Sequence, residues 1–358
     1  MSGLSGLGKA LLPCSNAIYA GLLKQEKALY ALKDKRILIT GASGLLGTTL
    51  IYTLDYLNSL WGTNCHVTAL DMRPFNPVDL LQPALFRSLT TNLIYADRLP
   101  PGPAFDYAFA LAGIASPVAY EKRPYEALMV SVRGLDLVLQ SAVKGSRVVF
   151  SSSSEVYATP PAASIPTPET YIGAVEMLGK RACYDIGKLA GETLCWIHNQ
   201  QFANGAVIVR FFNAFGPGLA QSDQRILVKL AESIKRGEPL TVYRPGEVGD
   251  LPTRTYCPAA NSVYGLLLAA VGAPTIGPYN IGLDKPELTV PQLASRAAML
   301  GFKAPEVKVV PAPGLYSNEP RRRCPSIEKA KNELGYTPVM SLEDGLKLYL
   351  DWALEAYV

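Results

Sequence analysis

The sequence carries little charge of either sign. Charged residues make up 18% of the 358 residues, and 34 Lys plus Arg stand against 30 Asp plus Glu, a net charge of +4. The longest basic run is the triplet Arg321-Arg322-Arg323. Proteins that bind nucleic acid normally carry a strongly basic patch, so we expect no nucleic-acid partner.

Histidines are few, and the cysteines do not occur in closely spaced pairs. The chain has two histidines, His66 and His198, and six cysteines with no C-x-x-C spacing. A His-rich zinc site and a Ser-His-Asp triad both need histidine near other functional groups, which this sequence does not offer. We therefore expect no metal, and we interpret the cysteines as reduced thiols of a cytoplasmic protein.

Long apolar runs are also missing. No uninterrupted apolar stretch reaches the ~18 residues of a membrane span. The first 21 residues contain one lysine, Lys9, and a short apolar patch cut by Pro13, whereas a secretory signal has a basic start and a small-residue cleavage site. The sequence thus predicts a cytoplasmic protein without a membrane partner.

What the sequence does have is apolar content in a regular pattern. Hydrophobic residues reach 49%, enough for a large core, and the length corresponds to about two domains. Short apolar runs alternate with helix-length segments, which indicates a parallel sheet covered by helices on both faces. The expected strands are Arg36–Thr40, Cys65–Leu70, Tyr107–Ala112, Arg147–Ser151 and Ala206–Phe211, and the expected helices are Gly44–Leu57, Tyr125–Val143 and Arg181–Gln201.

The predicted fold class is therefore α/β, a Rossmann-type doubly wound parallel sheet with a smaller C-terminal substrate-binding region. Residues 1–33 form a helical extension, with Ser15 or Asn16 as the expected helix cap. We expect residues 34–216 to form the domain that carries the sheet, to which the motifs below assign dinucleotide binding, and residues 217–358 mainly to bind the substrate, with segments that return to the first domain. Pro and Gly become frequent after this boundary.

A glycine-rich turn follows the first expected strand and opens a helix. Its sequence, Gly41-Ala-Ser-Gly44-Leu-Leu-Gly47, offers the tight turn, the room for a pyrophosphate and the helix N-terminus that a dinucleotide needs. Asp71 ends the second strand, where a carboxylate binds the ribose diol of NAD and repels the 2′-phosphate of NADP. Because of Arg73, NADP remains an alternative cofactor, but NAD is favoured.

A tyrosine and a lysine, Tyr184 and Lys188, lie one helical turn apart. An ammonium group beside a tyrosine lowers the pKa of the phenol, so the tyrosine can take a proton near neutral pH. Upstream, an expected strand runs into Ser151-Ser-Ser-Ser-Glu155-Val-Tyr157, which puts hydroxyls and a carboxylate where parallel sheets bind ligands. With the glycine turn, these motifs indicate one catalytic site.

These motifs resemble those of the extended short-chain dehydrogenase/reductase (NAD-dependent epimerase/dehydratase) family. Within it they are most similar to those of the UDP-glucuronate decarboxylases, or UDP-xylose synthases. The resemblance covers nearly the whole chain from residue 36 onwards. The stretches that carry it are Leu111–Tyr120, Ser151–Tyr157, Glu169–Lys188, Arg210–Pro217, Gly237–Tyr243, Thr253–Tyr256 and Glu319–Leu334.

The resemblance implies NAD as the cofactor, a nucleotide sugar as the substrate and a set of site residues. The catalytic residues would be Tyr184 and Lys188 for hydride transfer at sugar C4, Ser153 beside the 4-oxygen, Ser154 and Glu155 facing the reacting carbons, and Arg254. The cofactor-binding residues would be Gly41, Ser43, Gly44, Leu45, Leu46, Gly47, Asp71, Asp97, Leu111, Ala112, Tyr184 and Lys188. The substrate-binding residues would be Asn213, Arg225, Tyr243, Arg254, Tyr316 and Arg322.

The resemblance also implies a homodimer in which helices Tyr125–Val143 and Arg181–Gln201 pair with their copies. Both carry apolar residues on more than one face, and such surplus apolar surface favours association. The residues that suggest this are Leu135, Leu137, Val138, Leu189, Leu194 and Trp196.

The leading hypothesis is decarboxylation of UDP-glucuronate, by oxidation at C4, loss of CO₂ from the β-keto acid and re-reduction to UDP-xylose. A 4,6-dehydratase would need an acid where Ser154, a poor proton donor, stands. A 4-epimerase would leave Glu155 unexplained, but departures from the family pattern near the sugar pocket, such as Ile172 in place of Trp, keep it open. If the chain were a non-catalytic NAD-binding regulatory protein, we would expect Tyr184 or Lys188 to be replaced, but both are present.

Overall fold

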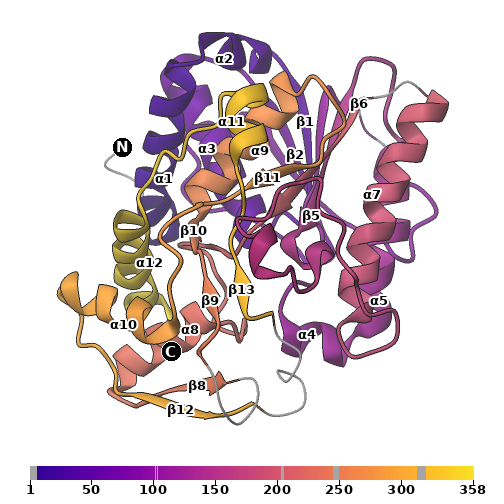
Figure 1. Cartoon of the computed structure of the whole chain (residues 1–358). Coiled ribbons are helices and arrows are strands. Elements are labelled where there is room, and N and C mark those ends of the chain that lie inside the picture. Colours follow the sequence, from indigo (N-terminus) through magenta and orange to yellow (C-terminus); the bar gives the residue numbers. More distant parts are fainter. Residues whose placement is uncertain (1–5, 101, 103, 203–204, 245–249, 313–319) are drawn as a thin grey trace.

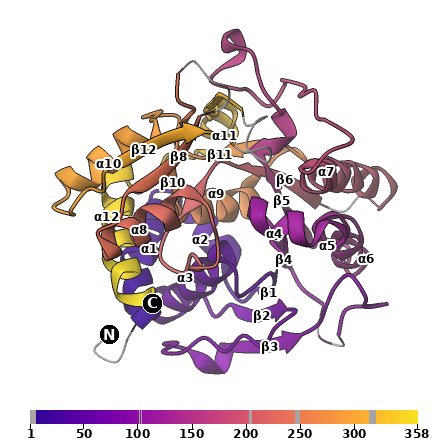
Figure 2. The same ribbon diagram turned by 90° about the horizontal axis from the view of Figure 1, so that it is seen from below.

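The computed structural model describes residues 6–100, 102, 104–202, 205–244, 250–312 and 320–358. Its centre is a seven-stranded sheet in which all neighbouring strands are parallel. Figure 2 shows the sheet from below. The strand order is β11 (Tyr279–Ile281), β6 (Gly205–Phe211), β5 (Arg147–Ser153), β4 (Tyr107–Ala110), β1 (Arg36–Thr40), β2 (His66–Asp71) and β3 (Phe86–Thr90).

The strand order reverses between β1 and β4, which confirms the predicted doubly wound sheet. All five expected strands are present. Two strands of the sheet were not predicted: β3, whose residues are partly exposed and include Arg87, Ser88 and Thr90, and β11, which is three residues long. The strand expected to reach Ala112 ends at Ala110, so the backbone of Ala112 is free to approach the glycine turn.

Helices cover both faces of the sheet, because its strands are apolar on both sides. Ile37 and Ile39 pack toward one face, whereas Leu38 packs toward the other. On the first face lie α1 (Gly6–Leu23), α2 (Glu26–Leu32), α3 (Leu45–Trp61) and α9 (Ala259–Gly272). On the second lie α4 (Pro117–Lys122), α5 (Pro124–Met129), α6 (Leu135–Gln140) and α7 (Ala182–Phe202), with a π-helical turn at Val130–Gly134 dividing the expected helix into α5 and α6.

The N-terminal extension is part of this covering layer. The expected cap at Ser15 or Asn16 is wrong, because α1 already begins at Gly6 and both residues lie inside it. Ser15 is buried, and Asn16 accepts a hydrogen bond from the hydroxyl of Tyr56 on α3. A polar side chain can stay inside a helix when a partner across the interface satisfies its hydrogen bonds.

The C-terminal lobe has its own apolar core below the sheet in the view of Figure 1. It contains α8 (Ile226–Arg236), β8 (Leu240–Arg244), α10 (Val290–Met299), β12 (Val307–Pro311) and α12 (Leu342–Ala356). Chain segments of the last third also return to the sheet, as β11, α9 and α11 (Glu328–Leu334). Two short parallel pairs join the two parts: β7 (Ala214–Phe215) with β10 (Cys257–Pro258), and β9 (Thr253–Arg254) with β13 (Arg322–Arg323).

Candidate active site

The predicted motifs meet in one cavity of about 560 Å³ at the carboxyl ends of β1, β4, β5 and β6. An open parallel sheet binds ligands at this edge, where the strand order reverses. The C-terminal lobe supplies the opposite wall. The predicted residues that line the cavity are Gly41, Ser43, Gly44, Leu45, Leu46, Gly47, Leu111, Ser153, Ser154, Glu155, Tyr184, Lys188, Asn213, Arg225, Tyr243 and Arg254.

The glycine turn leaves room that no other residue would leave. Gly41 has a φ of +68°, and a Cβ there would lie 2.7 Å from the backbone of Ala112. A Cβ on Gly47 would lie 2.4 Å from the carbonyl oxygen of Gly41. Gly44 precedes α3 and offers no capping side chain, so the helix N-terminus can bind an anion through its N–H groups and its dipole. This turn fits the pyrophosphate of a dinucleotide.

Asp71 braces the glycine turn against the end of β2. The backbone N–H and the hydroxyl of Ser43 donate to Oδ2 of Asp71 at 3.0 and 2.8 Å, and the N–H of Arg73 donates to Oδ1 at 3.2 Å. Asp71 itself is buried and does not line the cavity, whereas Arg73 does. The carboxylate thus lies directly behind the turn. Its predicted hydrogen bond to the ribose diol of the cofactor stays a prediction.

Tyr184 and Lys188 lie on the buried face of α7, one turn apart. The Nζ of Lys188 donates to the carbonyl of Ser151 at 2.7 Å and lies 5.7 Å from the centre of the Tyr184 ring. Burial lowers the pKa of Lys188 to about 8, although the Glu192 carboxylate acts in the opposite direction.

The expected low pKa of Tyr184 is wrong for this structure. Burial raises the pKa of Tyr184 to about 12, and a hydrogen bond with the Ser153 hydroxyl offsets only part of that rise. Desolvation penalises the phenolate, and the ammonium group of Lys188 is directed at a backbone carbonyl rather than at the phenol. Tyr184 is therefore a neutral phenol here, and its role as a base requires further positive charge beside it.

Glu155 is held between two arginines at the end of β5. It forms ion pairs with Arg181 and, at 2.9 Å, with Arg323. Arg323 also donates to the carbonyl of Ser154 at 2.6 Å. Burial alone would raise the pKa of Glu155, but the guanidinium groups of Arg323, Arg181 and Arg254 outweigh it and hold that pKa below its usual value. Glu155 is thus an ionised carboxylate in the cavity wall.

Tyr120 contributes a further polar group beside Tyr184. Its ring stacks on that of Tyr184, with the ring centres 5.5 Å apart and an angle of 15° between the planes. Its hydroxyl is buried and has no hydrogen-bond partner within the part of the chain that the structure describes. Because buried polar groups are normally paired, this hydroxyl in the cavity wall is available to a ligand.

The C-terminal lobe brings positive charge to the other end of the cavity. Arg225 precedes α8, and its Nε lies 2.9 and 3.0 Å from the two carboxylate oxygens of Asp223. Arg254 lies on β9, and the Nζ of Lys229 lies 5.5 Å from the ring centre of Tyr243. Guanidinium forks and ammonium groups are the usual partners of a diphosphate.

Four of the predicted residues that the structure describes do not line this cavity: Asp71, Ala112, Asp97 and Arg322. The side chain of Asp97 is fully exposed and lies 3.5 Å from Arg133. Arg322 points outward and pairs with Glu287 at 2.6 Å. Neither lines the cavity. Tyr316 lies outside the described residues.

Arg322 and Arg323 show why the sequence analysis selected the wrong member of the arginine triplet. Successive residues of a strand point to opposite sides, so only one of the two residues of β13 can face the sheet. Arg323 is 2% exposed and reaches Glu155. Arg181 and Tyr120 were also missed, although both lie in the stretches that carry the family resemblance.

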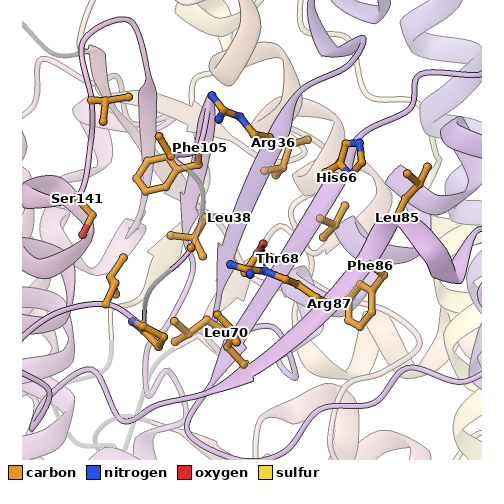
Figure 3. A pocket seen from close by; sticks show the side chains of 18 of the residues that line it. Arg36, Leu38, His66, Thr68, Leu70, Leu85, Phe86, Arg87, Phe105 and Ser141 are labelled. Carbon is orange, nitrogen blue, oxygen red and sulfur yellow. Dashed lines mark hydrogen bonds between the residues drawn. The ribbon is translucent and has the colours of Figure 1, made fainter.

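A second hollow of about 610 Å³ lies over the face of β1, β2 and β3 (Figure 3). Leu38 and Leu70 form part of its floor, and Arg87 crosses it to donate from Nε to the hydroxyl of Thr68 at 2.9 Å. None of the predicted site residues lines it. Despite its size, it lacks the converging catalytic groups of the first cavity.

Metal ligands and membrane helices are not seen in the described ranges. No group of three or more His, Cys, Asp or Glu side chains there is arranged to hold a metal ion. No helix in the same residues is both long and apolar enough to cross a bilayer.

Residues 37–282 match the NAD dependent epimerase/dehydratase family. UDP-glucuronic acid decarboxylase 3 of Arabidopsis thaliana is 33% identical over 320 residues, which is 88% of this chain and 88% of that relative. UDP-glucuronic acid decarboxylase 1 of Xenopus tropicalis is 32% identical over 317 residues, which is 87% of this chain and 70% of that relative. These matches agree with the resemblance seen in the motifs.

The solved structure of the epimerase Mth375 from Methanothermobacter thermautotrophicus has a similar fold. The TM-score is 0.74, with 24% sequence identity, and the match covers 92% of this chain and 95% of that one. At this identity the similarity concerns the fold alone. The doubly wound sheet and its C-terminal lobe therefore have a counterpart of known structure.

Proposed function

Because this chain belongs to the NAD dependent epimerase/dehydratase family, and NAD is therefore its cofactor, we propose that it decarboxylates UDP-glucuronate to UDP-xylose. The observation that carries this proposal is the ionised Glu155, held by Arg181 and Arg323 in the cavity wall beside Tyr184. Hydride transfer alone needs only Tyr184 and Lys188. A partly buried carboxylate fixed at this place serves a further chemical step.

The two parts of the chain divide the binding work in this proposal. Residues 34–216 hold NAD, with its pyrophosphate at the glycine turn, where Gly41 and Gly47 leave the required room. Residues 217–358 mainly hold the nucleotide sugar, with Arg225 and Arg254 toward the diphosphate. When bound, NAD accepts the hydride from sugar C4 and brings positive charge near the phenol.

The chain's own residues manage the protons of the reaction. Tyr184 takes the proton of the 4-hydroxyl, with Ser153 beside the same oxygen and Lys188 supplying positive charge. The C4 carbonyl makes the sugar a β-keto acid, so the electrons of the breaking C–C bond move toward that carbonyl as CO₂ leaves. The enolate left behind then takes a proton at C5 from water, and we propose that the Glu155 carboxylate in the cavity wall orients that water. Tyr184 returns its proton when C4 is reduced again.

Two related reactions use the same first step. A 4,6-dehydratase must expel the C6 hydroxyl, and Ser154 stands where the acid would be needed. A 4-epimerase needs space for the keto sugar to rotate and has no use for Glu155. The pairing of Glu155 with Arg181 and Arg323 favours decarboxylation over both.

Product analysis tests the proposal. The purified protein is incubated with NAD and UDP-glucuronate, and CO₂ release is measured together with mass and NMR spectra of the nucleotide sugar. We expect CO₂ and UDP-xylose in equal amounts, without net NADH, because the hydride returns to the sugar. UDP-glucose, which lacks the carboxylate, is the control and should give no CO₂. UDP-galacturonate as the sole product would instead identify a 4-epimerase.

We also propose that the protein is a homodimer that pairs through α5 and α7. Leu135, Leu137 and Val138, which suggested this from the sequence, are buried in the chain's own core and cannot form the interface. Trp196, which is one of the residues named from the sequence, and Tyr125 support the interface instead, because both leave more than half of their surface exposed. Large exposed apolar side chains commonly mark a protein interface.

Light scattering at micromolar concentration is expected to give twice the mass of the chain. Trp196→Glu should shift the protein to the monomer, because a charge would be buried at the interface. Met299→Glu, at an even more exposed apolar residue of α10, is the control and should remain dimeric. A monomeric wild-type protein would refute the dimer.

We place the protein in the cytoplasm. All six cysteines are free thiols, and five of them are buried. Unpaired cysteines persist in reducing compartments.

A further inference from the structure

Asp185 is a buried carboxyl group of the site that the proposed reaction does not use. It follows Tyr184 on α7 and is 9% exposed. Its Oδ1 has no hydrogen-bond partner among the described residues. Its Oδ2 lies 3.8 Å from Nε of Arg181, whereas Arg181 makes its close ion pair with Glu155. Two carboxyl groups thus share one guanidinium group, and only one of them is tightly bound.

The surroundings of Asp185 make its charge state variable near neutral pH. Burial raises the pKa of Asp185 to about 7, and the charge of Glu155 adds to that rise, while Arg181 and Arg323 oppose it. Two carboxyl groups that lie close together in a buried site do not both ionise easily. The titratable groups that face Asp185 are Glu155 from the turn after β5, Arg323 from β13, Tyr120 from α4, Arg181 from the turn before α7, and Cys183 and Tyr184 on α7 itself.

Apart from the effect of a bound cofactor on Tyr184, the three groups of this set that are neither arginine nor glutamate are neutral near pH 7. Burial raises the pKa of the Tyr120, Tyr184 and Cys183 side chains above their ordinary values. Asp185 is therefore the member of the cluster that gains or loses a proton around neutrality.

We propose that Asp185 is a positioning residue: with its proton it leaves Arg181 to Glu155, and without its proton it competes for the same guanidinium group. The inference rests on the proposed function, because it acts through Glu155, the carboxylate that serves the sugar. Ionised Asp185 adds a second negative charge next to Glu155 and draws Arg181 away from the cavity wall. The reaction should therefore slow as the pH rises above neutrality.

The charge state of Asp185 can be measured without any turnover. The substrate-free holoenzyme, with carbon-13 in its aspartate carboxyl groups, is titrated by NMR. Wild type should show one aspartate that titrates near pH 7, and this signal should be missing in Asp185→Asn. Asp351→Asn, at an exposed residue of α12 paired with Lys347, is the matched control and should keep the signal.

The rate profile then tests whether that proton controls the chemistry. The fraction of Asp185 that holds its proton falls about tenfold between about pH 6 and about pH 8. The wild-type rate of CO₂ release should therefore fall about tenfold over the same pH range. Asparagine mimics the neutral acid. In Asp185→Asn the basic limb should therefore move up by about one pH unit, toward the pKa of Lys188, which is about 8.

Each outcome separates the inference from the proposed function. An unchanged rate profile in Asp185→Asn, or an aspartate titration that stays within the ordinary acidic range in the wild type, would overturn the inference. A protein that shows the NMR titration but releases no CO₂ from UDP-glucuronate would overturn the decarboxylase proposal and, with it, the role of Asp185 in that reaction. A merely structural Asp185 would change stability but would not shift the basic limb.

Discussion

Replacing Tyr184 with phenylalanine is expected to lower the rate of sugar oxidation by at least ~10²–10⁴-fold, the contribution of a well-placed general base. The substitution removes only the hydroxyl, so the ring should still stack on Tyr120. Without the phenol, the proposed acceptor of the 4-hydroxyl proton is missing as the hydride leaves. NADH absorbance in a single turnover, and CO₂ release over many turnovers, should fall together.

The control for this substitution is Tyr95→Phe, because Tyr95 is an exposed tyrosine that does not line the cavity. It should leave both signals unchanged. Binding of NAD to Tyr184→Phe should also persist, because the glycine turn is untouched. A loss of less than tenfold in hydride transfer would show that another group takes the proton.

Replacing Glu155 with glutamine is expected to lower the rate of CO₂ release by at least about a hundredfold. The change keeps the size of the side chain and removes the charge that Arg181 and Arg323 share. Two guanidinium groups are then left facing a neutral amide, which is costly in a buried site. NAD binding should be preserved. Oxidation should be affected less than decarboxylation, so NADH and the 4-keto sugar should accumulate in the variant.

Glu121→Gln is the matched control for this experiment, because Glu121 forms an ion pair with Lys180 at 2.7 Å and does not line the cavity. It should release CO₂ at the wild-type rate. If Glu155→Gln also does so, Glu155 has no part in the chemistry. The decarboxylase proposal would then lose its main support over a 4-epimerase.

The sequence was enough to predict the core of the fold. Continuous apolar strands separated by helices leave a parallel sheet as the arrangement that buries both faces, and five of the seven strands were predicted. The edge strand β3 was missed because its residues are half-exposed and carry no apolar run, and β11 because three residues give too short a pattern. Tertiary pairing with β2 and β6 decides that these segments are strands.

The chemical motifs were also readable from local sequence. The glycine turn, the serines with Glu155, and Tyr184 with Lys188 each lie within a few residues, and the end of one strand or the turn of one helix fixes their geometry. The topology of a doubly wound sheet then places their strand ends at one edge. For this reason, these predicted residues line one cavity.

Which distant residues complete the site, and which charge each of them carries, depends on the tertiary structure. Arg323 lies 168 residues from Glu155 and reaches it because β13 pairs with β9, and strand alternation turns Arg322 the other way. The pKa values of Tyr184 and Asp185 depend on burial, which no residue spacing records. The sheet, the glycine turn and the Tyr-Lys pair can be predicted from local patterns in the amino-acid sequence. The positions of the guanidinium groups around Glu155, and the protonation states of the neighbouring carboxyl groups, depend on long-range packing and desolvation.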